Sequence, residues 1–148
     1  MDKELENLIE DCLDKLGDEE FKKGISKLLT TNDEKDVLTI IANEGIHPSS
    51  PAHNHGEIYV ASRGNIDFSS QEIVREELNK ILVGVAKKLK SKPWKKVYLV
   101  PFGPAVLSMQ IKLLVYRILY IETVDFLYAG HGTYYDLNIN LRVIAAES

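Results

Sequence analysis

Residues 98–104, Tyr-Leu-Val-Pro-Phe-Gly-Pro, decide the fold class of this chain. An apolar run ends there in a Pro-Phe-Gly-Pro turn, and a long apolar segment begins directly after it. The pattern predicts a strand, a tight turn and the N-terminus of a helix. In open parallel α/β sheets, ligands bind at the carboxyl ends of the strands, and a helix N-terminus offers free backbone N–H groups to an anion. This turn is the first candidate for part of a binding site.

Length and composition are those of one ordinary globular domain. The chain has 148 residues, of which 45% are hydrophobic and 27% are charged. The apolar segment 104–120 includes Lys112 and Arg117, which argues against a membrane span. The acidic N-terminus lacks a signal-peptide pattern, and the single Cys12 excludes internal disulfides and a CxxC zinc site. A cytoplasmic location is expected.

Apolar periodicity predicts five helices and four strands. Helices are expected over 2–16, 18–29, 33–43, 70–90 and 104–120, and strands over 57–61, 96–100, 123–128 and 135–143. Residues 45–55 read as a loop. The end signals are Gly17 and Gly45 after the first and third helices, Thr31 or Asn32 as the cap of the third, and a Ser69–Glu72 capping box.

This order predicts an α/β fold, a Rossmann-like three-layer sandwich with a mostly parallel sheet. The alternating residues 135–143 are typical of a half-exposed C-terminal strand, antiparallel to its predecessor and at the edge. Residues 1–45 are expected to form an acidic helical arm, and residues 46–148 the Rossmann-like domain. The sequence has no GxGxxG after the first strand and no GxxxxGK[ST], so a nicotinamide, flavin or Walker-type site is not expected. No cofactor is predicted.

Charge is unevenly distributed. Residues 1–45 carry thirteen acidic residues and six lysines, whereas residues 46–148 carry nine acidic and twelve basic residues. Six lysines fall within Lys87–Lys96, a run that is compatible with nucleic acid. The same run is also typical of a solvated helix end, where lysines complement the helix dipole. We favour the helix end and expect no direct DNA binding.

Three loops are expected to meet at the carboxyl ends of the strands: 61–65, 101–104 and 129–135. Together they supply an arginine, a histidine, hydroxyl groups, aromatic rings and glycine backbone, a mixture suited to bases and phosphate. These residues also have structural explanations: Gly103 and Pro104 fit the start of a helix, Tyr134 and Tyr135 fit an edge strand, and Arg63 fits a surface position. The candidate ligand-binding residues are Ser62, Arg63, Phe102, Gly103, Pro104, His131 and Tyr134.

The histidines suggest two further hypotheses. His47, His53 and His55 are close in sequence, and imidazole suits zinc, copper or nickel, but the spacing matches no established metal motif. A proline-rich surface loop explains them equally well, and no metal ligand is assigned. His131 lies between two glycines directly after a strand. It either donates a hydrogen bond to a phosphate or acts as a general acid or base. The alternative is an incidental residue of a glycine-rich hairpin turn.

Residues 96–142 resemble the C-terminal half of a SAVED domain, a relative of the CARF domains of CRISPR defence. The shared pattern is an apolar strand, the turn Gly103-Pro104-Ala105, a long helix, a strand ending at Tyr128, and then Tyr134 and Tyr135 before a last strand. The resemblance implies binding of a cyclic di-, tri- or oligonucleotide made as a second messenger in antiphage defence. A full SAVED domain has two CARF-like halves and this chain has room for one, so a homo-oligomer is implied.

The resemblance leaves two functions open. The chain is either a stand-alone oligomeric sensor or a metal-independent ring nuclease, in which Arg63 and His131 act on the phosphate as catalytic residues. Two hypotheses from other classes remain beside them. One is a structural or regulatory protein that works through its acidic arm, and the other is a metal-dependent hydrolase that uses His47, His53 and His55.

Overall fold

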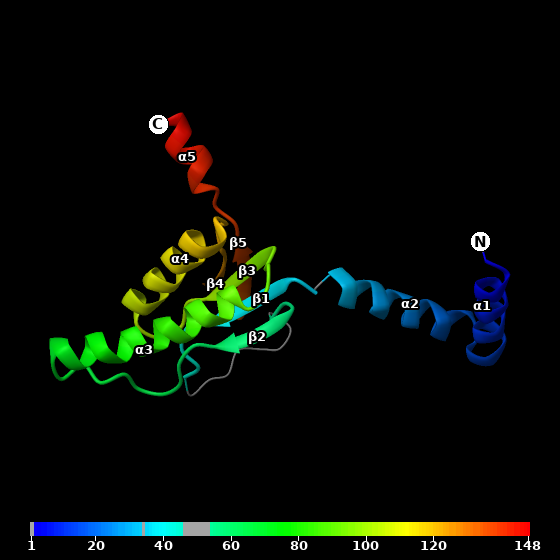
Figure 1. The fold of residues 1–148 in the computed structure, drawn as a ribbon, viewed down its shortest axis with the longest axis horizontal. Coiled ribbons are helices and arrows are strands. Elements are labelled where there is room, and N and C mark those ends of the chain that lie inside the picture. The colour runs from blue at the N-terminus through cyan, green and yellow to red at the C-terminus, as the bar shows by residue number, and fades with distance from the viewer. Residues whose placement is uncertain (1, 34, 46–53) are drawn as a thin grey trace. The chain divides into compact units, whose positions relative to one another are not determined.

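The computed structural model describes the backbone of residues 2–33, 35–45 and 54–148, and the side chains of these residues except 28–33. The chain divides into two compact units, Met1–Lys35 and Asp36–Ser148 (Figure 1). None of the helices in the described part of the chain is long and apolar enough to cross a membrane.

The first unit is a pair of helices, α1 (Lys3–Leu16) and α2 (Asp18–Asp33). Asp2 caps α1, where its carboxylate accepts a hydrogen bond from the Glu4 N–H at 3.2 Å. Gly17 ends α1 with φ +79°, a conformation that favours glycine, and its N–H donates to the Leu13 carbonyl. The predicted helices over 2–16 and 18–29 and the stop at Gly17 are confirmed.

The predicted helix over 33–43 is wrong. Residues Val37–Ile41 form strand β1, and Thr31 and Asn32 lie within α2 rather than at a cap. Four of the five β1 side chains are apolar, so the segment has apolar groups on every side, as a strand buried on both faces does. The boundary between the units therefore lies at Lys35–Asp36 and not at the predicted residue 45, and Gly45 ends no helix.

The second unit contains a five-stranded sheet in the order β2-β1-β3-β4-β5. Strand β1 pairs in parallel with β2 (Glu57–Val60) and with β3 (Lys96–Val100), and β3 pairs in parallel with β4 (Val124–Gly130). Strand β5 (Thr133–Leu137) is antiparallel to β4 and lies at the edge. The predicted α/β class, the mostly parallel sheet and the antiparallel edge strand are confirmed.

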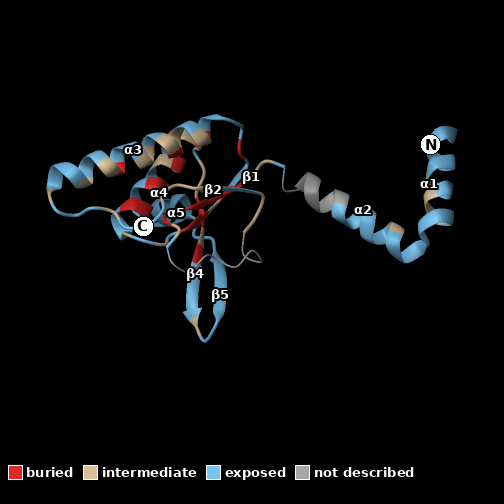
Figure 2. Ribbon diagram, turned by 90° about the horizontal axis from the view of Figure 1, so that it is seen from below, coloured by how far each residue is buried: buried red, intermediate tan, exposed pale blue. Residues whose placement is uncertain are grey.

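Helices α3 (Gln71–Lys90) and α4 (Ala105–Leu119) pack together and cover one face of the sheet, which we call the helix face (Figure 2). Side chains of β1 and β3 alternate, so every second residue points to these helices. The main core consists of Leu38, Ile40 and Ala42 of β1, Val97 and Leu99 of β3, Leu78, Val85 and Leu89 of α3, Leu107, Ile111 and Val115 of α4, and Trp94. Ser70, rather than the predicted Ser69, caps α3 and accepts from the Ile73 N–H.

The opposite side of the sheet, the second face, carries a smaller cluster. Ile41, Val100 and Phe126 are buried there, with Val60 and Phe102 packed against them, and no described helical residue belongs to this cluster. Thr39 points to the same face and is fully buried. Its hydroxyl donates to the His55 carbonyl at 2.6 Å and accepts from the His55 N–H at 2.9 Å, which satisfies the buried oxygen.

The C-terminal segment is only in part the strand that alternation predicts. Strand β5 ends at Leu137, and Leu141–Glu147 form helix α5. Asn140 caps α5 by accepting a hydrogen bond from the Val143 N–H at 3.2 Å, so the strand predicted to reach residue 143 is wrong. Short polar side chains such as Asn140 favour helix starts over strands, and this cap overrides the alternation.

Packing on the helix face predicts a clear contrast between two apolar truncations. Ile111 of α4 is fully buried against α3 and the sheet. Ile111→Ala should therefore lower the free energy of unfolding by about 2–5 kcal/mol. Val83 on α3 is 53% exposed, and Val83→Ala should change it by less than about 0.5 kcal/mol. Urea denaturation measures both. Equal losses would contradict the assignment of this face as the core.

A second prediction concerns the ion pairs between α3 and β2. The hydrogen bond from Lys88 Nζ, at 2.6 Å, is the main cause that holds the pKa of Glu57 below its ordinary value; burial opposes it, and Lys92 Nζ at 3.5 Å adds to it. A lowered folded-state pKa stabilises the fold above the unfolded-state pKa, and this stabilisation is lost as the pH falls through the folded-state pKa. Carboxyl NMR titration should show Lys88→Met raising the pKa of Glu57, with Lys80→Met leaving it unchanged.

Candidate functional site

The strand order places a topological switch point between β1 and β3. The chain leaves β1 toward β2 on one side of it, and reaches β3 and β4 on the other. The order 2-1-3-4-5 is that of flavodoxin-like sheets, in which the ligand lies at the carboxyl ends of the first and third strands. In this chain those ends carry Asn43 and Glu44 after β1 and residues 101–104 after β3. The candidate site is therefore at this edge.

Asn43 holds the edge together. Its side-chain N–H groups donate to Ser62 Oγ at 3.1 Å and to the Gly64 carbonyl at 2.9 Å, and the Ser62 hydroxyl donates to the Ala42 carbonyl at 2.6 Å. Asn43 is 5% exposed, so these bonds satisfy a polar group that water does not reach. The loops after β1 and β2 are locked to each other as a result.

Gly103 brings the third loop to the same place. It has φ +85°, which glycine adopts at little cost. A Cβ at this position would lie 2.6 Å from the Cβ of Asn43, so the loop after β3 touches the Asn43 side chain directly. Ser62 and Gly103, two of the predicted site residues, are thus joined through Asn43.

The N-terminus of α4 opens at this edge. Pro104 is the N-cap residue, and no side chain caps the first turn. The prediction placed the helix start one residue earlier, with Gly103 as the cap. Ser108, in the first part of α4, is 8% exposed, and its hydroxyl oxygen has no hydrogen-bond partner among the described residues. Uncapped backbone N–H groups with a positive helix end are a suitable environment for an anion.

Arg63 is at the same edge but already has a partner. Its Nη1 lies 2.7 Å from Glu44 Oε2, so the two side chains form an ion pair. The Arg63 side chain is 72% exposed. Together with Ser62 and Lys80 it lines a cavity of about 340 Å³ between the loop after β2 and α3.

Aromatic rings extend the site over the second face. The Phe102 ring packs edge-on against Phe126 with centroids 5.8 Å apart, and Phe126 stacks on Tyr134 at 4.8 Å. Tyr128 packs against Tyr134 at 5.0 Å. The predicted residues Phe102 and Tyr134 are therefore connected through a residue that the sequence did not single out. Stacked rings at a sheet face are typical of surfaces that bind bases.

His131 belongs to the same hairpin as Tyr128 and Tyr134 but is far from Arg63 in the strand order. It occupies the turn between β4 and β5 with φ +50°, next to Gly132 with φ +73°, as a two-residue type I′ hairpin requires. Strand β4 pairs with β3 only at Val124 and Asp125, although β4 continues to Gly130. The tip of the β4–β5 hairpin therefore projects beyond the sheet (Figure 2). Arg63 follows β2, three interstrand steps or roughly 14 Å from β4. One copy does not bring Arg63 and His131 to one reacting atom.

Metal ligation finds little support among the residues that the structure describes. His47 and His53 lie outside them. The His55 ring stacks on Tyr98 at 4.1 Å, and its Nε2 is 2.9 Å from Asp136 Oδ2. Within the described ranges, no three histidine, cysteine or carboxylate side chains are placed to hold a metal ion.

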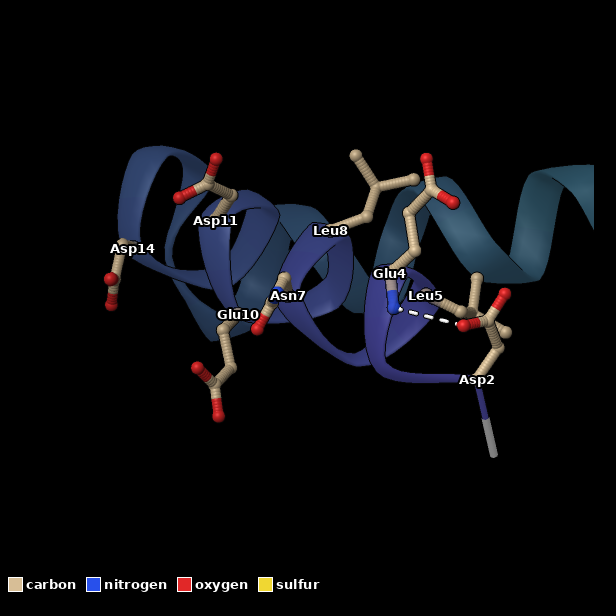
Figure 3. Close-up of a pocket in the computed structure, with 8 residues that line it drawn as sticks. All are labelled: Asp2, Glu4, Leu5, Asn7, Leu8, Glu10, Asp11 and Asp14. Carbon is tan, nitrogen blue, oxygen red and sulfur yellow. Dashed lines mark hydrogen bonds between the residues drawn. The ribbon is translucent and has the colours of Figure 1, made fainter.

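A further hollow lies along α1. It has a volume of about 610 Å³ and is lined by carboxylates together with Leu5, Asn7 and Leu8. Figure 3 shows Glu10, Asp11 and Asp14 pointing in different directions, away from one another. Such a surface has no shared focus for a ligand, and we read it as the solvated side of α1.

Sequence reasoning missed Asn43 and Glu44, because it placed Asn43 at the end of the predicted helix over 33–43 and Glu44 directly after it. The signal was present in the pattern: a short apolar run followed by Asn-Glu-Gly is typical of a buried strand that ends in a loop. Comparisons with protein-family models, curated proteins and solved structures find no match to this chain. Function is therefore argued from the site itself.

The Gly103–Asn43 contact generates a test of the site. Gly103→Ala puts a methyl group against Asn43 and forces a left-handed φ on alanine, which should cost about 2 kcal/mol of unfolding free energy. Gly130→Ala has the same backbone penalty, φ +88°, but open space around its Cβ. The difference between the two, measured by urea denaturation, isolates the steric contact. Equal losses of unfolding free energy would show that the Asn43 side chain moves aside without cost.

Proposed function

We propose that this protein binds a cyclic di- or oligonucleotide second messenger, as a stand-alone oligomeric sensor subunit of antiphage defence in the cytoplasm. The observation that carries the proposal is the uncapped N-terminus of α4 at the β1–β3 switch point, with Phe102 two residues before its N-cap and the Phe102 ring on the second face. A phosphate is suited to the helix N-terminus and a base to the ring. The sequence resemblance to SAVED and CARF domains supplies the cyclic form of the ligand.

The distances along the edge suit a ligand with more than one phosphate. The loops after β2 and β3 are separated by two interstrand steps, roughly 10 Å. Arg63 and Lys80 line the cavity at the β2 end, and the α4 N-terminus lies at the β3 end. A cyclic dinucleotide carries two phosphates on one ring, so one molecule can use both positions.

Binding is favoured over cleavage. The ring nuclease hypothesis needs Arg63 and His131 at one phosphate, but Arg63 is paired with Glu44 and His131 is at the tip of the β4–β5 hairpin. A regulatory role through the acidic arm has no comparable support, since the carboxylates of α1 converge on no common point. We therefore place the ligand at the carboxyl edge of the sheet and assign no catalytic residue.

Thermal-shift measurements with cyclic di-, tri-, tetra- and hexanucleotides test the proposal. A ligand at about 100 times its Kd should add roughly 2.7 kcal/mol, which raises Tm by roughly 5–11 °C in a chain of this size. Chromatography of the mixture should recover the intact ligand. Linear product would instead support the ring nuclease, and no shift with any member would overturn the proposal.

A matched pair of variants locates the ligand. Phe102→Leu keeps an apolar side chain but removes the ring, and it should weaken binding roughly 5- to 150-fold, the range for loss of one base–aromatic stack. Tyr135→Leu removes an exposed ring that strand alternation puts on the other side of β5 from Tyr134, and should leave Kd unchanged. Equal effects of the two changes would contradict the position of the site.

A further inference from the structure

Helix α4 has two apolar sides. One side packs on the sheet and α3 through Leu107, Ile111 and Val115. The other carries five large apolar side chains that are each 38–68% exposed. We call them the outer stripe: Val106, Met109, Leu113, Tyr116 and Tyr120.

The spacing of the outer stripe is that of a coiled-coil seam. Its members follow one another at alternating intervals of three and four residues, from the first turn of α4 to its left-handed C-cap residue Tyr120. This is the a/d pattern of a heptad repeat, through which one helix packs against another by knobs into holes. A single helix of a globular unit needs no second apolar side of this kind, so the stripe indicates a partner helix.

Helix α5 turns the outer stripe into a groove. A cavity of about 500 Å³ lies between α4 and α5 and is lined by Met109, Leu113, Tyr116, Leu141 and Ala145 among others. Seven residues are fewer than the roughly 12–15 that an isolated helix needs in water, and α5 has no buried residue. Arg142 holds it to α4 by donating to the Tyr120 carbonyl and by lying over the Tyr116 ring, with the guanidinium carbon 5.2 Å from the centroid.

We propose that the outer stripe binds the outer stripe of a second copy of this chain, as an antiparallel α4–α4 pair flanked by the two α5 helices. In an antiparallel pair, a positions pack opposite d positions. Centred between Met109 and Leu113, this arrangement sets Val106 opposite Tyr116 of the second copy and Met109 opposite Leu113 of the second copy. A small side chain thereby meets a large one at each end, and four of the five stripe residues of each copy are buried in one closed twofold interface, with Tyr120 beyond its end.

Charge is compatible with this pairing. Lys112, which borders the stripe, donates to Asp125 Oδ2 at 2.8 Å and to Thr123 Oγ1 at 2.6 Å within its own chain. Arg117 also borders the stripe, and the antiparallel arrangement puts the two Arg117 side chains at opposite ends of the pair. Lys112 of each copy lies next to the centre of the pair, and its ion pair with Asp125 of its own chain neutralises the ammonium group there. The inference of a dimer stands on the outer stripe itself. Only the role of the dimer rests on the proposed function, since the sensor requires more than one copy.

Sedimentation equilibrium of the full chain without nucleotide tests the pairing. Wild type should be a dimer. Leu113→Glu and Met109→Lys should each raise the dimer Kd by roughly 100-fold or more, because each buries an unpaired charge. Val83→Glu, an equally exposed apolar position on α3, should leave the dimer intact. Circular dichroism should show the same fold in all variants.

Mixing the two seam variants tests the antiparallel arrangement. The carboxylate introduced in one variant then faces the ammonium introduced in the other, and the dimer should return. A monomeric wild type, a dimeric Leu113→Glu, or a mixture that stays monomeric would overturn the inference. A dimer that binds no cyclic nucleotide would keep this interface and overturn the proposed function. A monomer that binds one would keep the nucleotide site and overturn both this interface and the oligomeric form of the sensor.

Discussion

The burial of β1 is the constraint on which the rest of this structure depends. Leu38, Thr39 and Ile40 are fully buried, and the strand has a partner on each edge. Its apolar side chains anchor the layer of α3 and α4, and the Thr39 hydroxyl fixes the segment that returns to β2. Because β1 is held on all sides, Asn43 at its end has a fixed position, and the candidate site is built around that amide.

Helix α4 connects the candidate site to the outer stripe. Its N-terminus opens at the carboxyl edge of the sheet, its inner side belongs to the core, and its outer side carries the heptad pattern. Lys112 ties the middle of the helix to β4 through Thr123 and Asp125. Because α4 is a rigid helix, the position of its outer side fixes the position of its N-terminus. Pairing of two copies would thus set the spacing between their two N-termini, which a ligand that bridges copies would sense.

The sequence predicts this fold where a local pattern has one meaning. Helix α3 has a clear amphipathic face, and β3 ends in a turn that cannot continue a strand, so both were expected within a residue or two. β1 was missed because a short run such as Val-Leu-Thr-Ile-Ile is compatible with a buried helix or a buried strand, and only its tertiary partners decide. Helix α5 was missed because Asn140 acts as a cap at a point where alternation still continues.

The candidate site also has residues that the sequence predicts and residues that it does not. Ser62, Phe102 and Gly103 follow predicted strands, so their place at the carboxyl edge could be inferred from topology. Asn43 and Glu44 could not, since their strand was not recognised. The distance of His131 from Arg63 depends on how far β4 runs past β3, which is a property of the pairing and is not encoded in either strand alone.

The pairing of β1 also bears on how the chain folds during synthesis. The β2 partner of Leu38 is 19 positions further along the chain, but the β3 partner of Val37 is 59 positions away. At roughly 5–20 residues per second, the ribosome needs about 3–12 s to supply that second edge. Throughout this interval an apolar strand with an unpaired edge is a template for aggregation. The acidic unit precedes β1 in the chain, and like charges on neighbouring chains oppose such association.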